Sequence, residues 1–331
     1  MAREAGVSVG TASDALSGRG RMTDRTRAGV RDVAQRLGYR ANALARGLRT
    51  GRTHAIGLHL MHSADHFDTE YFREFVAGLM DVAIRHDYDL TLLSSDPERQ
   101  RVAAPQVDGI IIPDPIATDV RAIELLSSTT PVVVGERLPP GMPAVPVIGV
   151  EHETALVELL DHAHAAGARR PVLFAADGQS GWGAVLRDVY ARWCADHGVL
   201  ARHCSIPFEG RRFAGDGGGQ LSTLLEQKGA VDLVIVPGEH AVLTALELIA
   251  KAGLTVGRDI MLAACADAHL LRICDPPITA ISLSPRILGA SCAEALVDYL
   301  DQGVPIGDLT LLPSELVRRL STATLEVRSD L

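Results

Sequence analysis

Short apolar runs alternate with segments of helical period along most of the chain. The runs have the length of strands, and helices are expected at residues 71–85, 185–197 and 241–252. Continuous apolar strands alternating with helices indicate parallel sheets that helices cover on both faces. There are enough such units for two doubly wound lobes, with predicted strands at residues 55–61, 90–93, 109–112, 131–134, 172–175, 233–236 and 260–265.

Residues 1–50 follow a different pattern, in which short helices are separated by glycine-containing turns. Residues 2–6 have the pattern of a helix end closed by Gly6, and Ser8 can cap a second helix over residues 9–16. In that helix Ala12, Ala15 and Leu16 can face a core, while Thr11 and Ser13 lie on the polar side. Helix, turn and helix in this order are typical of a helix-turn-helix, whose second helix enters the major groove of DNA.

Two further helices are expected in the same segment. The first covers residues 24–37, has Thr23 as its N-cap and carries its apolar residues at helical spacing. The second is short, covers residues 43–49 and begins at Asn42. Because Gly47 weakens it, this last helix is expected to be only marginally stable on its own.

The charge of the chain is divided unevenly. The whole sequence carries a net charge of −9, which taken alone argues against nucleic-acid binding. Residues 1–54 contain eleven arginines against four acidic residues, a net +7, which leaves −16 for the remainder. A basic head on an acidic body is the asymmetry expected of a small nucleic-acid-binding module joined to another domain.

Two stretches of the head resemble the headpiece of LacI/GalR (lactose-repressor) family regulators. They are residues 2–18, Ala-Arg-Glu-Ala-Gly-Val-Ser-Val-Gly-Thr-Ala-Ser-Asp-Ala-Leu-Ser-Gly, and residues 37–51, Leu-Gly-Tyr-Arg-Ala-Asn-Ala-Leu-Ala-Arg-Gly-Leu-Arg-Thr-Gly. Both motifs are long and correctly spaced, and the resemblance continues more loosely to the C-terminus. It implies a helix-turn-helix domain over residues 1–40, a hinge helix and linker over 41–53, and an effector-binding and dimerisation domain over 54–331.

The resemblance also implies which residues meet DNA. The second helix reads bases, through Ser8, Val9, Gly10, Thr11, Ser13 and Asp14. The hinge helix orders on DNA, and its Leu48 matches a leucine that wedges into the minor groove, where it bends the duplex at the cost of unstacking. Arg46 and Arg49 would lie near phosphates, and the remaining hinge contacts would be Asn42 and Ala45.

Two features depart from the family pattern. Asp14 stands where the family usually has Arg, and a carboxylate can only accept hydrogen bonds, for example from cytosine N4. We therefore expect either an unusual operator or a reduced affinity. Met1 stands where family members carry Val after several earlier residues, so we expect the natural start to lie upstream.

For the body, the resemblance implies a periplasmic-binding-protein-like α/β fold of two doubly wound lobes. The first lobe is expected to take residues 54–148 and 280–304, and the second 149–279 and 305–331. The chain then crosses between lobes three times, so that closing the cleft rotates one lobe on a hinge. Only about a dozen residues, 95–107, connect two of the strands, which is at the limit for a parallel crossover.

Loops that follow strands supply the expected ligand contacts, because ligands of such folds bind at the carboxyl ends of strands. Tyr71 and Phe72 take the place of the family's Phe-Phe pair, whose rings pack against ligands, although rings at this place can equally belong to the core. The expected ligand-binding residues are His62, Asp65, Tyr71, Phe72, Glu136, Trp182, Arg187, Glu239 and Asp267.

Several family anchors are missing from this set. Gly238-Glu239 replaces the family's Asn-Asp, and Cys265-Ala266-Asp267 replaces Phe-Asp-Asp, in which the first Asp holds ligand hydroxyls. Asp267 either substitutes for that residue or caps the next helix. The effector is therefore a sugar, a different small molecule, or none if the pocket is degenerate.

Other classes of protein have weaker support. No run of about 18 apolar residues predicts a membrane span, and without a signal peptide we expect the chain to stay in the cytoplasm. The five cysteines lack metal-type pairs, and no Walker loop or hydrolase elbow is present, so we expect no metal, no cofactor and no enzymatic activity. The alternative is a small-molecule-binding protein whose DNA head is degenerate or non-functional.

The sequence thus predicts a ligand-responsive transcriptional repressor. Its partners would be a pseudo-palindromic operator in double-stranded DNA, a small-molecule effector such as a sugar, and a second copy of itself. The C-terminus has no appended leucine heptad that would predict a tetramer.

Overall fold

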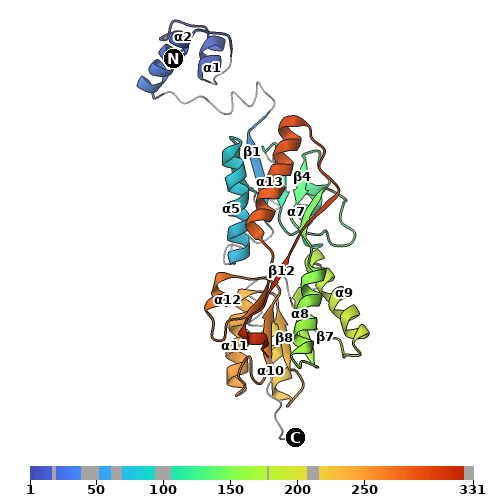
Figure 1. The fold of residues 1–331 in the computed structure, drawn as a ribbon. Helices are drawn as coiled ribbons and strands as arrows, with labels where there is room; N and C mark the ends of the chain where they lie inside the picture. Colours follow the sequence, from blue (N-terminus) through green and yellow to red (C-terminus); the bar gives the residue numbers. More distant parts are fainter. Residues whose placement is uncertain are drawn as a thin grey trace. The chain divides into compact units, whose positions relative to one another are not determined.

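A computed structural model describes residues 1–16, 20–38, 52–60, 69–93, 106–176, 179–206 and 216–323. The chain forms two compact units, Met1–His54 and Ala55–Leu331 (Figure 1). Within the described ranges, no helix combines the length and the hydrophobicity needed to span a bilayer.

The smaller unit begins with the turn that the sequence predicts at Gly6. The Gly6 N–H donates to the Arg3 carbonyl at 3.3 Å, and the Val7 N–H donates to the Ala2 carbonyl at 3.1 Å. With Gly6 at φ +65°, these two bonds form a Schellman motif, the usual end of a helix. The prediction that Gly6 closes a helical segment is confirmed.

Two helices follow this turn at the predicted places. Helix α1 (Val9–Leu16) starts after Ser8, whose Oγ accepts from the Thr11 N–H at 3.0 Å. Helix α2 (Asp24–Arg36) starts after Thr23, whose side chain accepts from the Thr26 N–H. The two helices enclose a small core of Ala12, Ala15 and Val30, with Met1, Ala2, Ala5, Val7, Leu16 and Met22 packed against it.

The first lobe of the larger unit is built on a six-stranded parallel sheet in the order β11-β5-β4-β3-β1-β2. Its strands are β1 (Ala55–His59), β2 (Asp89–Leu93), β3 (Gly109–Ile112), β4 (Val132–Val134), β5 (Val147–Val150) and β11 (Leu309–Leu312). Its helices are α5 (Glu70–Arg85), α7 (Val120–Leu126) and α13 (Pro285–Gln302).

The second lobe repeats the arrangement with the order β12-β10-β9-β8-β6-β7, in which only β12 is antiparallel to its neighbour. Its strands are β6 (Pro171–Ala176), β7 (Arg202–Ile206), β8 (Leu233–Val236), β9 (Met261–Ala264), β10 (Thr279–Ser282) and β12 (Glu315–Val317). Its helices are α8 (Glu153–Ala165), α9 (Gly181–Asp196), α10 (Asp216–Glu226), α11 (Glu239–Lys251), α12 (His269–Ile273) and the 3₁₀ helix η2 (Leu320–Thr322). The two doubly wound lobes that the sequence predicts are confirmed.

The chain crosses between the lobes three times, but two crossings do not fall at residues 280 and 305. Strand β10 pairs with β9, so the second lobe extends to Ser282. Strand β11 pairs with β5, so the first lobe extends to Leu312. Backbone pairing decides these boundaries, and it moves both crossings later in the chain than predicted. Most of the expected short connection 95–107 lies outside the described residues.

Helices α5 and α13 lie side by side on the first lobe, as Figure 1 shows, and glycines allow their close approach. A Cβ added to Gly289 would lie 2.0 Å from the Phe75 carbonyl oxygen, and one added to Gly78 would lie 1.9 Å from that of Arg286. Backbone therefore packs against backbone here, and neither helix has room for a methyl group.

A buried hydrogen bond joins His59, at the end of β1, to Asp119, the N-cap residue of α7. His59 Nε2 donates to Asp119 Oδ2 at 2.8 Å, and Asp119 Oδ1 accepts from the Ala122 N–H at 2.9 Å. Both side chains are almost fully buried. Burial alone would raise the pKa of Asp119, but the hydrogen bonds from His59 and from backbone N–H groups lower it below its usual value.

Substitution of Gly289 by Ala should destabilise the first lobe. The added methyl group must separate the two helices, which costs about 1–3 kcal/mol and is measured as a lower urea midpoint by circular dichroism, since both tryptophans lie in the second lobe. Gly219→Ala on α10 is the matched control, because nothing lies within 4 Å of the added Cβ. Equal midpoints for the two variants would show that the helices are not in close contact.

Substitution of Asp119 by Asn should make the protein less stable at pH 7, by about 1–3 kcal/mol. Because the folded pKa of Asp119 is lowered, its contribution is present above the unfolded value near about 4 and is lost as the pH falls through the folded pKa. The difference from the wild type should therefore shrink in acid. The control Asp81→Asn, which removes a surface ion pair with Arg286, should change the stability much less. If the loss of stability caused by Asp119→Asn is the same at pH 7 and in acid, Asp119 does not have a lowered pKa in the folded protein.

Candidate functional site

The start of α1 presents the residues expected to read bases. Ser8, Val9 and Gly10 are exposed, and Val9 is 79% exposed. The Ser8 hydroxyl is engaged in capping, with its Oγ also 2.9 Å from Thr11 Oγ1. The Val9 side chain and the Gly10 backbone are therefore the exposed groups at the start of the helix. Because both are small, this end of the helix can approach a partner surface closely.

Asp14 lies near the other end of the same helix and is half-buried beside Gly20. A Cβ added to Gly20 would lie 3.0 Å from Asp14 Cβ, and Gly20 has φ +81°. Arg27 Nη2 donates to the Gly20 carbonyl at 3.3 Å. Asp14 therefore packs closely against Gly20, and Arg27 of α2 binds the carbonyl of the same glycine.

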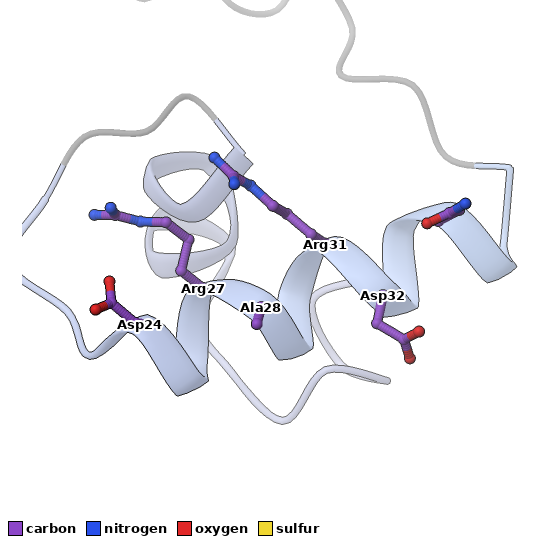
Figure 2. Close-up of a pocket in the computed structure, with 6 residues that line it drawn as sticks. Asp24, Arg27, Ala28, Arg31 and Asp32 are labelled. Carbon is purple, nitrogen blue, oxygen red and sulfur yellow. The ribbon is translucent and has the colours of Figure 1, made fainter.

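Helix α2 adds basic side chains to this unit. Figure 2 shows a surface hollow in which Arg27 and Arg31, one turn apart, extend from the same side of the helix. Asp32 is drawn away from them and pairs with Arg36 at 3.0 Å. Arg27 and Arg31 thus place two positive charges on this side of α2, beside the Asp24 carboxylate, and basic side chains of this kind are suited to phosphates. The hinge residues Asn42, Ala45, Arg46, Leu48 and Arg49 lie outside the described residues.

In the larger unit, polar side chains gather where strands of the first lobe end. Asp114 follows β3, Glu136 follows β4 and His152 follows β5. Glu136 Oε2 is 3.1 Å from His152 Nε2, and both side chains are buried. Trp182, in the first turn of α9 of the second lobe, has its ring centroid 6.5 Å from that of His152. The cluster therefore draws on both lobes.

The electrostatics of the cluster are acidic. Burial raises the pKa of Asp114 well above its usual value, and the neighbouring Glu136 raises it further. Burial likewise raises the pKa of Tyr71, with smaller contributions from Glu136 and Asp114. Two carboxyl groups and a phenol thus share one poorly solvated region, where a hydrogen-bond donor would be strongly attracted.

Several buried polar atoms of the cluster have no hydrogen-bond partner among the described residues. Because such atoms are rare in folded proteins, they mark the groups that are available to a ligand. A carboxylate oxygen accepts, an indole or guanidinium N–H donates, and a ligand that satisfies them all needs both donors and acceptors. The atoms are Asp114 Oδ1, Arg137 Nε, His152 Nδ1 and Trp182 Nε1.

The lobes touch beside this cluster. The Ala117 N–H donates to the Gln179 carbonyl at 2.8 Å, and Ile116 forms an isolated bridge with Ser180. A Cβ added to Gly181 would lie 2.0 Å from the Arg137 carbonyl oxygen. In this structure the lobes are therefore closed against each other at the carboxyl ends of β3, β4 and β6.

The residues predicted to bind a ligand have several different surroundings. Tyr71, Glu136 and Trp182 belong to the cluster, whereas Phe72 is 3% exposed and stacks on Phe75 in the core. Arg187 donates to the Ala176 carbonyl at the end of β6. His62 and Asp65 lie outside the described residues.

Two of the predicted ligand residues are engaged by protein groups. Both oxygens of Asp267 are held by Arg319, at 2.8 and 2.7 Å, and Oδ1 also accepts from the Ala268 N–H. Glu239 accepts from the Glu70 N–H at 2.7 Å. The sequence pattern missed Asp114 and His152, although both obey the rule that selected Glu136: each is polar and follows a buried strand.

Comparisons with known proteins agree with these two units. The model of bacterial regulatory proteins of the lacI family matches residues 1–42, and the periplasmic binding protein-like domain matches residues 160–322. The HTH-type transcriptional regulator AglR of Rhizobium meliloti (strain 1021) is 30% identical over 100% of this chain and 95% of its own length. Catabolite control protein A of Priestia megaterium is 25% identical over 97% of this chain and 98% of its own length.

Solved structures share the fold. The lac repressor dimer bound to operator and the anti-inducer ONPF superposes with a TM-score of 0.82, at 22% identity and with 97% of each chain covered. A complex of the transcriptional regulator CelR with cellobiose gives a TM-score of 0.72 at 20% identity, over 97% of this chain and 98% of that one. Because the whole chain matches a regulator at 30% identity and its head matches the family model, the resemblance in the sequence is confirmed. The chain belongs to the lacI family of bacterial regulatory proteins, and it is a DNA-binding transcriptional regulator.

Proposed function

We propose that this regulator is a cytoplasmic repressor that binds a pseudo-palindromic operator as a homodimer, and that a small molecule in the interlobe cleft controls its affinity for DNA. The observation that carries the proposal is the presence of two sites in one chain. One is an exposed, capped helix start on a basic unit, and the other is a cluster of unpartnered polar atoms between two lobes.

The proposed DNA contacts lie at the start of α1, where Ser8, Val9 and Gly10 are exposed, and along the helix beyond it. Val9, Gly10 and Thr11 approach base edges, Ser8 keeps the helix start in shape, and Ser13 and Asp14 lie farther along. Arg27 and Arg31 of α2 are suited to phosphates. Leu48 is proposed to wedge into the minor groove, with Asn42, Ala45, Arg46 and Arg49 around it.

An exposed apolar strip supports self-association. On α5, Met80 and Ile84 are one turn apart and are 44% and 69% exposed, and Ile287 on the neighbouring α13 is 58% exposed. Ion pairs between the same helices lie beside it, including Arg85 with Glu294 at 3.2 Å. Exposed apolar side chains rimmed by charges are typical of interfaces between protein subunits.

The ligand is proposed to be a polyhydroxylated molecule such as a sugar, because hydroxyl groups both donate and accept. It would donate to Asp114, accept from Trp182 Nε1 and lie near the Tyr71 ring. The relative CelR was solved with cellobiose, which supports a sugar as the first class to test. Asp267 and Phe72 are left out of the proposed contacts, because Arg319 engages the first and the core encloses the second.

Selection of bound DNA from a random pool tests the DNA function. The wild type should enrich a pseudo-palindrome, and Asp14→Arg should change the preferred base in each half-site, because Arg donates to guanine where Asp can only accept. Thr26→Ser, which keeps the hydroxyl beside Thr23 in the cap of α2, is a control that should leave the selected sequence unchanged. If no sequence is enriched while a small molecule still binds, the protein is a ligand-binding protein with a non-functional head.

Tryptophan fluorescence tests the cleft. A panel of mono- and disaccharides that includes cellobiose should give a ligand that changes the emission of the wild type and of Trp193→Phe, but not of Trp182→Phe. Asp114→Ala should weaken binding of that ligand by about tenfold, because a hydroxyl of the ligand loses its hydrogen-bond partner in a buried site. A signal that Trp182→Phe retains and Trp193→Phe loses would place the ligand elsewhere.

A further inference from the structure

Two carboxylates each bind the first N–H group of a helix in the opposite lobe. Glu239, the first residue of α11 in the second lobe, accepts through Oε1 from the Glu70 N–H at 2.7 Å. Glu70, the first residue of α5 in the first lobe, accepts through Oε2 from the His269 N–H at 2.8 Å. His269 is the first residue of α12 in the second lobe. The two bonds therefore run across the cleft in opposite directions.

These bonds satisfy groups that a helix cannot satisfy itself. The first four N–H groups of a helix have no partner within it, and α12 also has no side-chain cap of its own, because its N-cap residue is Ala268. Glu70 supplies the missing acceptor from the other lobe. Hydrogen bonds to a carboxylate are about twice as strong as neutral ones, so the contact is strong for its size.

The strength of this interlobe contact is limited by the like charges of the two carboxylates and by their exposure to water when the lobes separate. Glu70 and Glu239 carry like charges and meet at the start of α5, where the dipole of a 16-residue helix attracts the Glu239 carboxylate. Once the lobes separate, both carboxylates return to water and both N–H groups lose their partner. The contact can therefore exist only in the closed arrangement.

We propose that Glu70 and Glu239 are positioning residues that hold the two lobes closed, by means of an interlobe latch made of their carboxylates and the N–H groups of Glu70 and His269. The latch is made of protein groups alone and shares no residue with the Asp114, Glu136 and His152 cluster, although Glu70 immediately precedes Tyr71. It sets how readily the lobes part before a ligand arrives. Any effect of the latch on DNA affinity rests on the proposed function, whereas its effect on how readily the lobes separate does not.

A contact elsewhere between the lobes reports on their separation. The Ala117 N–H donates to the Gln179 carbonyl at 2.8 Å, and it involves no latch residue. Its exchange with deuterium requires this bond to open, so its rate measures lobe opening. A latch that only caps helix ends would leave Ala117 unaffected.

The test is hydrogen–deuterium exchange at residue resolution on the full chain without ligand. Glu239→Ala should speed exchange of the Glu70 amide, and Glu70→Ala should speed that of the His269 amide, each in the opposite lobe. Both variants should also speed exchange at Ala117 by about tenfold, as expected for the loss of one charge-assisted bond. Unchanged exchange at Ala117 in both variants would overturn the proposal.

Matched variants separate the latch from general destabilisation. Glu70→Gln keeps an acceptor oxygen and should restore slow exchange at Ala117 in large part. Glu74→Ala removes a surface ion pair with Arg286 one turn along α5 and should behave as the wild type. If Glu74→Ala speeds exchange at Ala117 as much as Glu70→Ala, the effect is not specific and the proposal fails.

The donor can be removed as well as the acceptor. Proline is tolerated at the first position of a helix, and Ala268 before it is extended, at φ −148° and ψ 157°, as a residue before proline should be. His269→Pro should therefore leave α12 intact and speed exchange at Ala117 as Glu70→Ala does. Wild-type exchange at Ala117 in this variant would show that the Glu70 bond does not hold the lobes.

Discussion

Parallel strand pairing is the constraint on which the cleft depends. In a parallel sheet all strands have their carboxyl ends at the same edge. The residues that follow β3, β4 and β5 therefore lie close together in space, although they are far apart in the sequence. Asp114, Glu136 and His152 are brought together in this way. The three crossings then turn the same edge of the second sheet toward the first, which brings Trp182 to the cluster.

The sequence predicted six of the eight inner strands of the two sheets, missing β5 and β10, and only one of the four edge strands, β2. Strands β3, β4 and β8 are buried along their whole length and read as continuous apolar runs. Strands β7, β11 and β12 are only partly buried, so they lack such a run. The lobe boundaries that were placed too early depend on β10 and β11, whose membership is set by pairing partners far away in the chain.

Those residues of the site were predictable whose position depends on neighbouring residues in the sequence. The position after a buried strand identified Glu136, and the start of a helix identified Trp182. The partners of Glu239 and Asp267 were not predictable, because they are 169 and 52 residues away, at Glu70 and Arg319. Either acid could equally have faced a ligand, and only the fold decides which hydrogen-bond donor reaches it first.

The close approach of Gly181 to the Arg137 carbonyl has a consequence for how the lobes move. At this point backbone packs against backbone, with no room for a methyl group between the two lobes. No flexible side chain lies there that could change rotamer and so allow the lobes to close only in part. The contact is either made or lost. A signal that passes through the lobes of this regulator is therefore closer to a switch between two positions than to a graded displacement.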